Sequence, residues 1–174
     1  SYIGLVRYAD ILKNLIDAVR GRKNVFLYLH GEGQDLSELK KYAQDCNNIK
    51  FTGRYEGNEL PRLYAGADLV WAAYPNKDYN VKYAISNKFH ESIAYHVPCV
   101  YAKETLLGDF VSEKNIGYVV DPYNVSDINR FIDYVLEHRS DLLVKKQALK
   151  QYAGQEMGWN EQFQPIIEYL NLLK

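Results

Sequence analysis

The sequence predicts a doubly wound α/β fold, in which a parallel sheet of about six strands carries helices on both faces. Short apolar segments alternate with amphipathic ones along the 174 residues, as they do in chains built from βαβ units. The apolar segments have few polar residues on either face, which is typical of strands that are covered on both sides. Because crossovers between parallel strands are right-handed, a doubly wound sheet is the simplest arrangement of these units.

The expected strands are short apolar runs bounded by glycine, proline or polar residues. In chain order they cover residues 2–7, 25–29, 49–53, 68–74, 99–102 and 117–120. Gly31 and Gly33 turn the chain after the second strand, Pro75 ends the fourth, and Pro98 opens the fifth. Parallel strands end at one edge of their sheet, so we expect a ligand site beyond these carboxyl ends.

The expected helices combine apolar residues at helical spacing with a polar residue that can cap the first turn. In chain order they cover residues 9–21, 36–46, 58–66, 86–96, 105–114, a long segment from 126, 140–152 and 159–173. Asp35, Asn58 and Ser126 are the expected caps of three helices, and Ser86 or Asn87 is the expected cap of a fourth. Residues 75–85 are polar and are expected to be irregular.

Composition narrows the class of protein. With 47% hydrophobic and 25% charged residues, the chain is unlike a disordered protein or a coiled coil. A net charge of -1 argues against a bulk electrostatic grip on nucleic acid, and no apolar run approaches the ~20 residues of a membrane span. A strand begins almost at the first residue, without a starting Met. We therefore expect residues 1–174 to be one domain, the C-terminal half of a longer chain.

The start of the helix over residues 86–96 is the strongest candidate for a binding site. A helix N-terminus presents free N–H groups and partial positive charge, which suit a diphosphate, and Lys88 would add a full charge. Glu91 lies three residues further, roughly on the same face, where it could accept hydrogen bonds from the vicinal hydroxyls of a ribose. The alternative is a surface Lys–Glu pair of little energetic weight.

Arg7 closes the first strand and would reach the same crevice, where arginine suits phosphate oxygens. The alternative is a surface arginine at a strand end.

The sequence lacks the motifs of several other kinds of binding and catalytic site. The glycines of residues 31–33 follow the second strand and lack the third glycine of a dinucleotide fingerprint, so a tight turn is expected. The sequence contains no P-loop, no nucleophile elbow and no metal-ligand spacing of histidines.

Six motifs in the same order resemble the C-terminal, donor-binding domain of a GT-B-fold retaining glycosyltransferase of the group 1 type. They are YIGLVR at 2–7, LIDA at 15–18, LHGEG at 29–33, FTGRY at 51–55, ELPRLYAGAD at 59–68 and ESIAYHVPCV at 91–100. The segment NKFHE at 87–91 is especially similar to bacterial capsule and exopolysaccharide transferases. The resemblance covers nearly the whole chain and implies a Rossmann-like half of a GT-B fold.

The resemblance also implies roles for individual residues. Arg7 and Lys88 would bind the donor diphosphate and stabilise the leaving nucleotide as catalytic residues, and Glu91 would hold the ribose hydroxyls. The donor-binding positions that it implies are Gly4, Gly53, Arg54, Tyr55, Ser86, Asn87 and Glu91. The loop over residues 53–55 would pass near the base.

The implied activity is retaining, metal-independent transfer of a hexosyl-type sugar from a nucleotide-diphosphate sugar, with a UDP-sugar as the first choice and no cofactor. The whole protein would act in bacterial surface polysaccharide synthesis. Its glycan or lipid-linked acceptor would bind to an upstream domain, on which the helix over residues 159–173, with Trp159, would partly pack. We expect a cytoplasmic protein with peripheral membrane association and no nucleic acid partner. Residues 1–174 alone would bind nucleotide weakly and transfer nothing.

The sequence departs from the family pattern at two places. Tyr83 stands eight residues before Glu91, where the family often has a second glutamate near the donor sugar. A lysine often follows the family's arginine by about five residues, but here Lys13 is six residues on and Asp10 takes the aligned place. Three other interpretations remain open: a nucleotide-sugar epimerase or hydrolase of the same fold, a non-catalytic nucleotide-binding or interaction domain, and, more remotely, a nicotinamide oxidoreductase.

Overall fold

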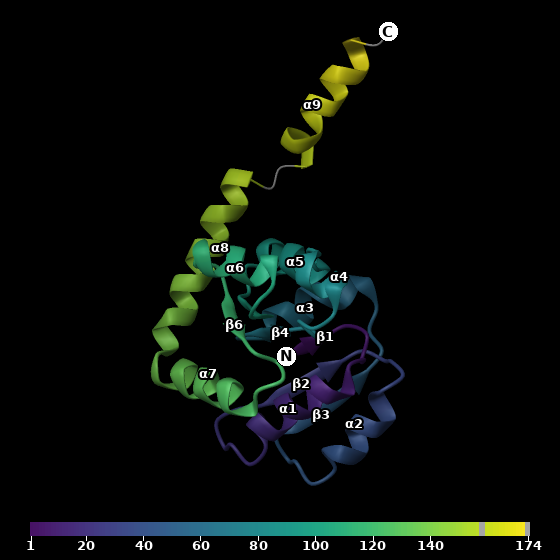
Figure 1. Cartoon of the computed structure of the whole chain (residues 1–174), viewed down its shortest axis with the longest axis vertical. Coiled ribbons are helices and arrows are strands. Elements are labelled where there is room, and N and C mark those ends of the chain that lie inside the picture. Colours follow the sequence, from purple (N-terminus) through teal and green to yellow (C-terminus); the bar gives the residue numbers. More distant parts are fainter. Residues whose placement is uncertain (157–158, 173–174) are drawn as a thin grey trace.

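The computed structural model describes residues 1–156 and 159–172 and contains the predicted alternation of strands and helices (Figure 1). The strands are β1 (Tyr2–Ile3), β2 (Leu27–His30), β3 (Ile49–Gly53), β4 (Val70–Ala72), β5 (Cys99–Ala102) and β6 (Tyr118–Val120). The helices of the N-terminal half are α1 (Ala9–Val19), α2 (Leu36–Tyr42), the 3₁₀ turn η1 (Gly57–Glu59) and α3 (Leu60–Ala65). Those that follow are α4 (Tyr79–Tyr83), α5 (Asn87–Tyr95), α6 (Leu106–Glu113), α7 (Val125–Glu137), α8 (Arg139–Glu156) and α9 (Trp159–Leu172).

The strands form two parallel three-stranded sheets, in the orders β1-β2-β3 and β4-β5-β6. The two sheets adjoin at Ser1, whose amino group donates to the Leu69 carbonyl at 2.7 Å and whose carbonyl accepts from Trp71 N at 2.7 Å. This is the hydrogen-bond pattern of a parallel pair, so the combined order is β3-β2-β1-β4-β5-β6. That order is the one found in doubly wound dinucleotide-type folds, which confirms the predicted fold class.

Helices cover both faces of the sheet and bury two apolar clusters. One cluster joins α1, α2 and α7 to the strands, and the other joins α3, α5 and α6 to the opposite face. Helix α8 contributes Leu142 to the first cluster and Leu149 to the second, so it crosses from one face to the other beside β6 (Figure 1). The burial of both faces explains why the strands are apolar runs rather than alternating ones.

The expected first strand is shorter in the structure because the chain leaves the sheet at Gly4. Gly4 has a φ of +148°, a region that favours glycine, and its N–H donates to the His30 carbonyl at 2.9 Å. Two residues on, Val6 N donates to the Glu32 carbonyl at 2.8 Å. The segment over residues 4–7 therefore pairs with the loop after β2 instead of continuing a strand.

Several local predictions were wrong. The segment over residues 75–85 contains the short helix α4, whose N-cap Asp78 accepts from Asn80 N at 2.8 Å. Asn124, not Ser126, caps α7, and Glu56, not Asn58, caps η1. Asp35 stands at the N-cap of α2, but its carboxylate accepts from Ala9 N at 2.9 Å and so serves the start of α1. The Asp35 carboxylate therefore caps α1, which is distant in the sequence, and not the helix that begins next to it.

The chain ends in α9, which projects away from the rest of the molecule (Figure 1). Its described side chains, over residues 163–172, are exposed along the helix, and they include Ile166, Ile167 and Leu170. The side chain of Trp159, which the sequence placed on this helix, lies outside the described residues. None of the described helices combines the length and the apolar character that crossing a bilayer demands.

Candidate functional site

A polar pocket of about 470 Å³ lies beyond the carboxyl ends of β1, β4 and β5, where the fold predicts a ligand site. Its walls come from the loop after β1, from α4, from the start of α5 and from the loop between β5 and α6. Seven of the nine predicted site residues line it: Gly4, Arg7, Tyr55, Ser86, Asn87, Lys88 and Glu91. These seven residues lie up to 87 positions apart in the sequence.

Close backbone packing fixes the loops at this edge of the sheet. A side chain at Gly31 would place Cβ 1.9 Å from the Gly4 carbonyl oxygen, and one at Gly33 would place it 2.1 Å from the Val6 oxygen. Gly31 N also donates to the Gly53 carbonyl at 2.7 Å. The glycines of residues 31–33 thus let the loops after β1, β2 and β3 interlock, in agreement with the tight turn that the sequence predicts.

Helix α5 points its N-terminus at the pocket. Ser86 occupies the N-cap in extended backbone, but its side chain makes no capping hydrogen bond. Its Oγ is buried and has no hydrogen-bond partner among the described residues, while the neighbouring Asn87 is exposed. The first turn of α5 therefore offers free N–H groups and a free hydroxyl to an anionic ligand.

Lys88 and Glu91 form an ion pair inside this pocket. Lys88 Nζ lies 2.6 Å from Glu91 Oε2, and only 9% of the lysine side chain and 22% of the glutamate side chain are exposed. The same Oε2 accepts a second hydrogen bond, from the hydroxyl of Tyr64 at 2.7 Å. Lys88, Glu91 and Tyr64 thus form a mostly buried cluster. The alternative of an exposed surface pair, which the sequence left open, does not hold.

Arg7 reaches the pocket from the opposite wall. Its side chain is exposed, and its guanidinium carbon lies 4.7 Å from the centroid of the Tyr8 ring. Tyr8 has a left-handed backbone, with a φ of +68°, and its ring lies 6.2 Å from that of Tyr74, which also lines the pocket. Burial and the charge of Glu91 raise the pKa of the Tyr55 hydroxyl, so this residue lies in the field of the same carboxylate.

Two predicted site residues lie outside the pocket lining. Gly53 closes β3 with a φ of +79° and has open space where a side chain would be. Arg54 is exposed and lies 3.5 Å from Glu56 in an exposed ion pair. Sequence reasoning missed the residues of and after α4 that form one wall, namely Asn80, Val81, Ala84 and Ile85. It also missed the contact of Tyr64 with Glu91.

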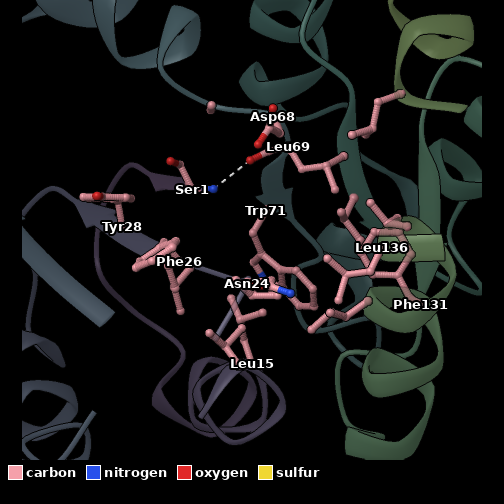
Figure 2. A pocket seen from close by; sticks show the side chains of 18 of the residues that line it. Ser1, Leu15, Asn24, Phe26, Tyr28, Asp68, Leu69, Trp71, Phe131 and Leu136 are labelled. Carbon is pink, nitrogen blue, oxygen red and sulfur yellow. Dashed lines mark hydrogen bonds between the residues drawn. The ribbon is translucent and has the colours of Figure 1, made fainter. Parts of the chain in front are cut away.

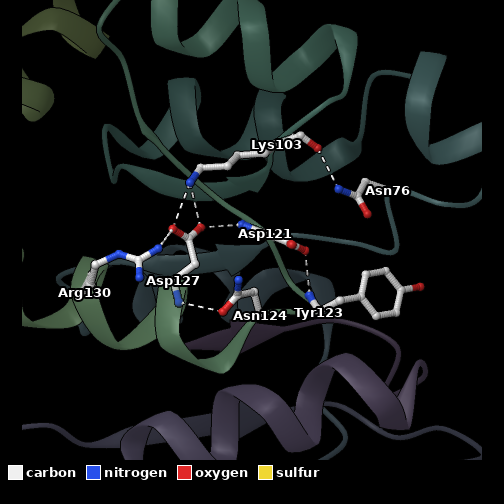
Figure 3. Close-up of polar contacts among 7 residues, drawn as sticks. All are labelled: Asn76, Lys103, Asp121, Tyr123, Asn124, Asp127 and Arg130. Carbon is white, nitrogen blue, oxygen red and sulfur yellow. Dashed lines mark hydrogen bonds and ion pairs between the residues drawn. The ribbon is translucent and has the colours of Figure 1, made fainter.

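A second polar cluster lies at the carboxyl ends of β5 and β6 (Figure 3). Asp127 accepts from Lys103 Nζ at 2.7 Å, from Arg130 at 2.9 Å and from Asp121 N at 2.8 Å. Burial of Asp127 acts to raise the pKa of its carboxyl, but these donors outweigh burial and hold that pKa below its usual range. Asn76 donates to the Lys103 carbonyl at 2.9 Å, so the cluster anchors the loop that leads to α4.

An apolar pocket of about 330 Å³ lies at the other end of the sheet, beside the amino ends of the strands (Figure 2). Leu15, Trp71, Phe131 and Leu136 line it, and Trp71 Nε1 is buried without a hydrogen-bond partner among the described residues. Ser1 also lines it. None of the predicted site residues lies there.

One histidine that the sequence contains at a strand end has a structural partner. His30 Nδ1 lies 2.8 Å from Thr52 Oγ1, and burial lowers the pKa of the imidazole. Among the residues that the structure describes, no three His, Cys, Asp or Glu side chains are grouped so that they could hold a metal ion.

Comparison with known proteins identifies relatives of this fold. The model of the family described as "Glycosyl transferases group 1" matches residues 2–156. No protein with a curated description matches the chain. The Anabaena protein HepE, in a crystal structure with UDP, has a TM-score of 0.77 and 20% identity over 98% of this chain and 47% of HepE. Its complex with UDP-glucose gives a TM-score of 0.76 and 21% identity over the same shares.

The catalytic domain of cholesterol-α-glucosyltransferase from Helicobacter pylori has a TM-score of 0.69 and 23% identity over 87% of this chain and 93% of that domain. At these identities the likeness shows the fold alone. The fold is that of one half of the two-domain GT-B arrangement, as the sequence predicts. The chain spans about half the length of HepE.

Proposed function

The chain belongs to the glycosyl transferases group 1 family, and we propose that it binds the nucleotide-diphosphate sugar donor of a glycosyltransferase. The observation that carries this proposal is the polar pocket, in which Arg7, Lys88 and the N-terminus of α5 converge beside Glu91. Two cations and a helix N-terminus suit a diphosphate, and a carboxylate next to them suits the ribose hydroxyls. HepE, which has the same fold, was crystallised with UDP and with UDP-glucose, so a UDP-sugar is the first choice of donor.

The residues of the pocket fit the charge that develops during transfer. The bond between the sugar C1 and the oxygen of the second phosphate breaks, and the oxygen of an acceptor hydroxyl forms a new bond to C1. The proton of that hydroxyl passes to an oxygen of the leaving phosphate. The electron pair of the broken bond stays on the nucleoside diphosphate. Arg7, Lys88 and the N–H groups of α5 would stabilise that charge, without help from a metal, and C1 would keep its configuration.

The pocket is one side of a larger site in this proposal. The chain spans about half of HepE, and the acceptor, a glycan or a lipid-linked sugar, would bind to an upstream domain. The exposed apolar side chains of α9 would pack partly on that domain. The whole protein would transfer a hexosyl group in bacterial surface polysaccharide synthesis, in the cytoplasm and peripherally at the membrane, whereas residues 1–174 alone would transfer nothing.

The test is a calorimetric titration of residues 1–174 with UDP, GDP, ADP and CMP. Half a site should bind its nucleotide with a dissociation constant of roughly 0.1–1 mM. We expect selective binding of UDP that is lost in Glu91→Ala and kept in Glu137→Ala, which removes the same charge from an exposed position on α7. Binding of none of the four nucleotides by the longer protein would contradict the proposal, as would equal binding by both variants.

Metal independence has its own test. We expect the dissociation constant of UDP to be the same within twofold in EDTA and in Mg²⁺, because protein cations supply the positive charge. A tenfold gain in affinity on adding Mg²⁺ would show that a metal contributes to diphosphate binding.

A further inference from the structure

The carboxylate of Glu91 is held from behind by a buried tyrosine. The hydroxyl of Tyr64 donates to Glu91 Oε2 at 2.7 Å, although the two residues lie on different helices, α3 and α5. Glu91 lines the polar pocket, but Tyr64 does not. Tyr64 therefore contacts the carboxylate from the protein side and leaves its pocket side open.

Tyr64 cannot readily move away from this position. It is fully buried, with 0% of its surface exposed, in the apolar cluster beneath α3 and α5. Its ring lies 4.7 Å from the ring of Tyr95, which stands four residues after Glu91 on the same face of α5. Tyr64 thus contacts α5 at two successive turns: its hydroxyl bonds to Glu91 and its ring packs against Tyr95.

The two donors to Glu91 differ in what a ligand would do to them. Lys88 faces the pocket, where a phosphate would compete for its ammonium group. Tyr64 does not line the pocket, so its hydroxyl would keep its bond to Oε2 when Lys88 turns to the ligand. Burial raises the pKa of this hydroxyl well above its ordinary value, so it remains a donor at any working pH.

The remaining oxygen of Glu91 is thereby directed to the ligand. Both hydrogen bonds that the described residues make to this carboxylate end on Oε2, so Oε1 has no protein donor. We propose that Tyr64 is a positioning residue that fixes Glu91 with Oε1 presented to the ribose hydroxyls of the donor nucleotide. This inference rests on the proposed function and assigns selectivity for a ribose over a deoxygenated sugar to the Tyr64–Glu91 pair.

The experiment compares UDP with 2′,3′-dideoxy-UDP, which lacks both ribose hydroxyls. Dissociation constants are measured by calorimetry for the wild type, Tyr64→Phe and Tyr95→Phe. The last variant removes a hydroxyl from the ring that packs against Tyr64 and leaves Glu91 unchanged. We expect the wild type to prefer UDP about tenfold and Tyr64→Phe to prefer it only about twofold, because a charged hydrogen bond that orders the carboxylate is lost. The affinity of Tyr64→Phe for the dideoxy nucleotide should not change.

A Tyr64→4-aminophenylalanine variant keeps the ring and a donor and should restore the tenfold preference, and it serves as the main variant if Tyr64→Phe does not fold. A preference for UDP that survives Tyr64→Phe would overturn the inference, as would an equal loss of affinity for both nucleotides. A wild type that binds both nucleotides equally would instead overturn the proposed role of Glu91, and the inference with it. Tyr95→Phe should behave as the wild type; the same loss of preference there would reduce Tyr64 to a packing residue.

Discussion

The two ends of the sheet carry pockets of opposite character, although the same strands build both. At the carboxyl ends, loops interlock through glycine and bring Arg7, Lys88 and Glu91 into a polar pocket. At the amino ends, Leu15, Trp71 and Phe131 surround an apolar pocket that holds no predicted site residue. The presence of a pocket therefore does not by itself identify a binding site for a polar ligand. The apolar pocket has few groups that could form hydrogen bonds or ion pairs with such a ligand.

The largest expected effect tests whether the two pockets are independent. Leu15→Ala should lower the free energy of unfolding by about 2–4 kcal/mol, because it removes a buried side chain from the apolar pocket. The dissociation constant of UDP should stay within twofold, since Leu15 lies at the far end of the sheet. Urea unfolding and calorimetry measure the two quantities. The matched variant Leu107→Ala, in the wall of the polar pocket, should lower the free energy of unfolding and raise the dissociation constant of UDP. A loss of UDP affinity in Leu15→Ala would show that the pockets are coupled.

The next effect concerns the positive charge that Lys88 contributes to the polar pocket. Lys88→Met should weaken UDP binding about tenfold, because it removes a nearly buried cation from the diphosphate site. Binding of uridine, which has no phosphates, should not change. Lys82→Met, on the exposed side of α4, removes the same charge and should leave UDP binding unchanged. An equal loss for UDP and uridine would mean that Lys88 supports the pocket structure rather than the phosphates.

The smallest effect concerns Arg54, which the sequence predicts to be a site residue but which lies outside the pocket lining. Arg54→Ala should change the dissociation constant of UDP by less than twofold, because Arg54 is exposed, lies near Glu56 and does not line the pocket. Arg7→Ala should weaken UDP binding severalfold in the same assay. A matching loss of UDP affinity in Arg54→Ala would indicate that the loop over residues 53–55 lies near the base, as the family resemblance implies.

Much of the fold could be read from local patterns. The six strands occur where apolar runs lie between glycine, proline and polar residues, and α1, α5 and α7 occur where helical spacing predicts them. Helix α4 was missed because its sequence, YNVKY, has too little periodicity in five residues to be distinguished from a loop. The cap of α1 was missed because its carboxylate comes from Asp35, 26 residues away.

Local sequence patterns place Arg7, Lys88 and Glu91 at the carboxyl edge of the sheet, because parallel strands end together at one edge. The partners of these side chains depend on how the helices pack. Glu91 meets Tyr64 because α3 and α5 pack on the same face of the sheet, and Arg54 lies exposed beside Glu56 instead of in the pocket lining. A local pattern sets periodicity and edges, whereas a hydrogen bond across 27 residues depends on how two helices cross.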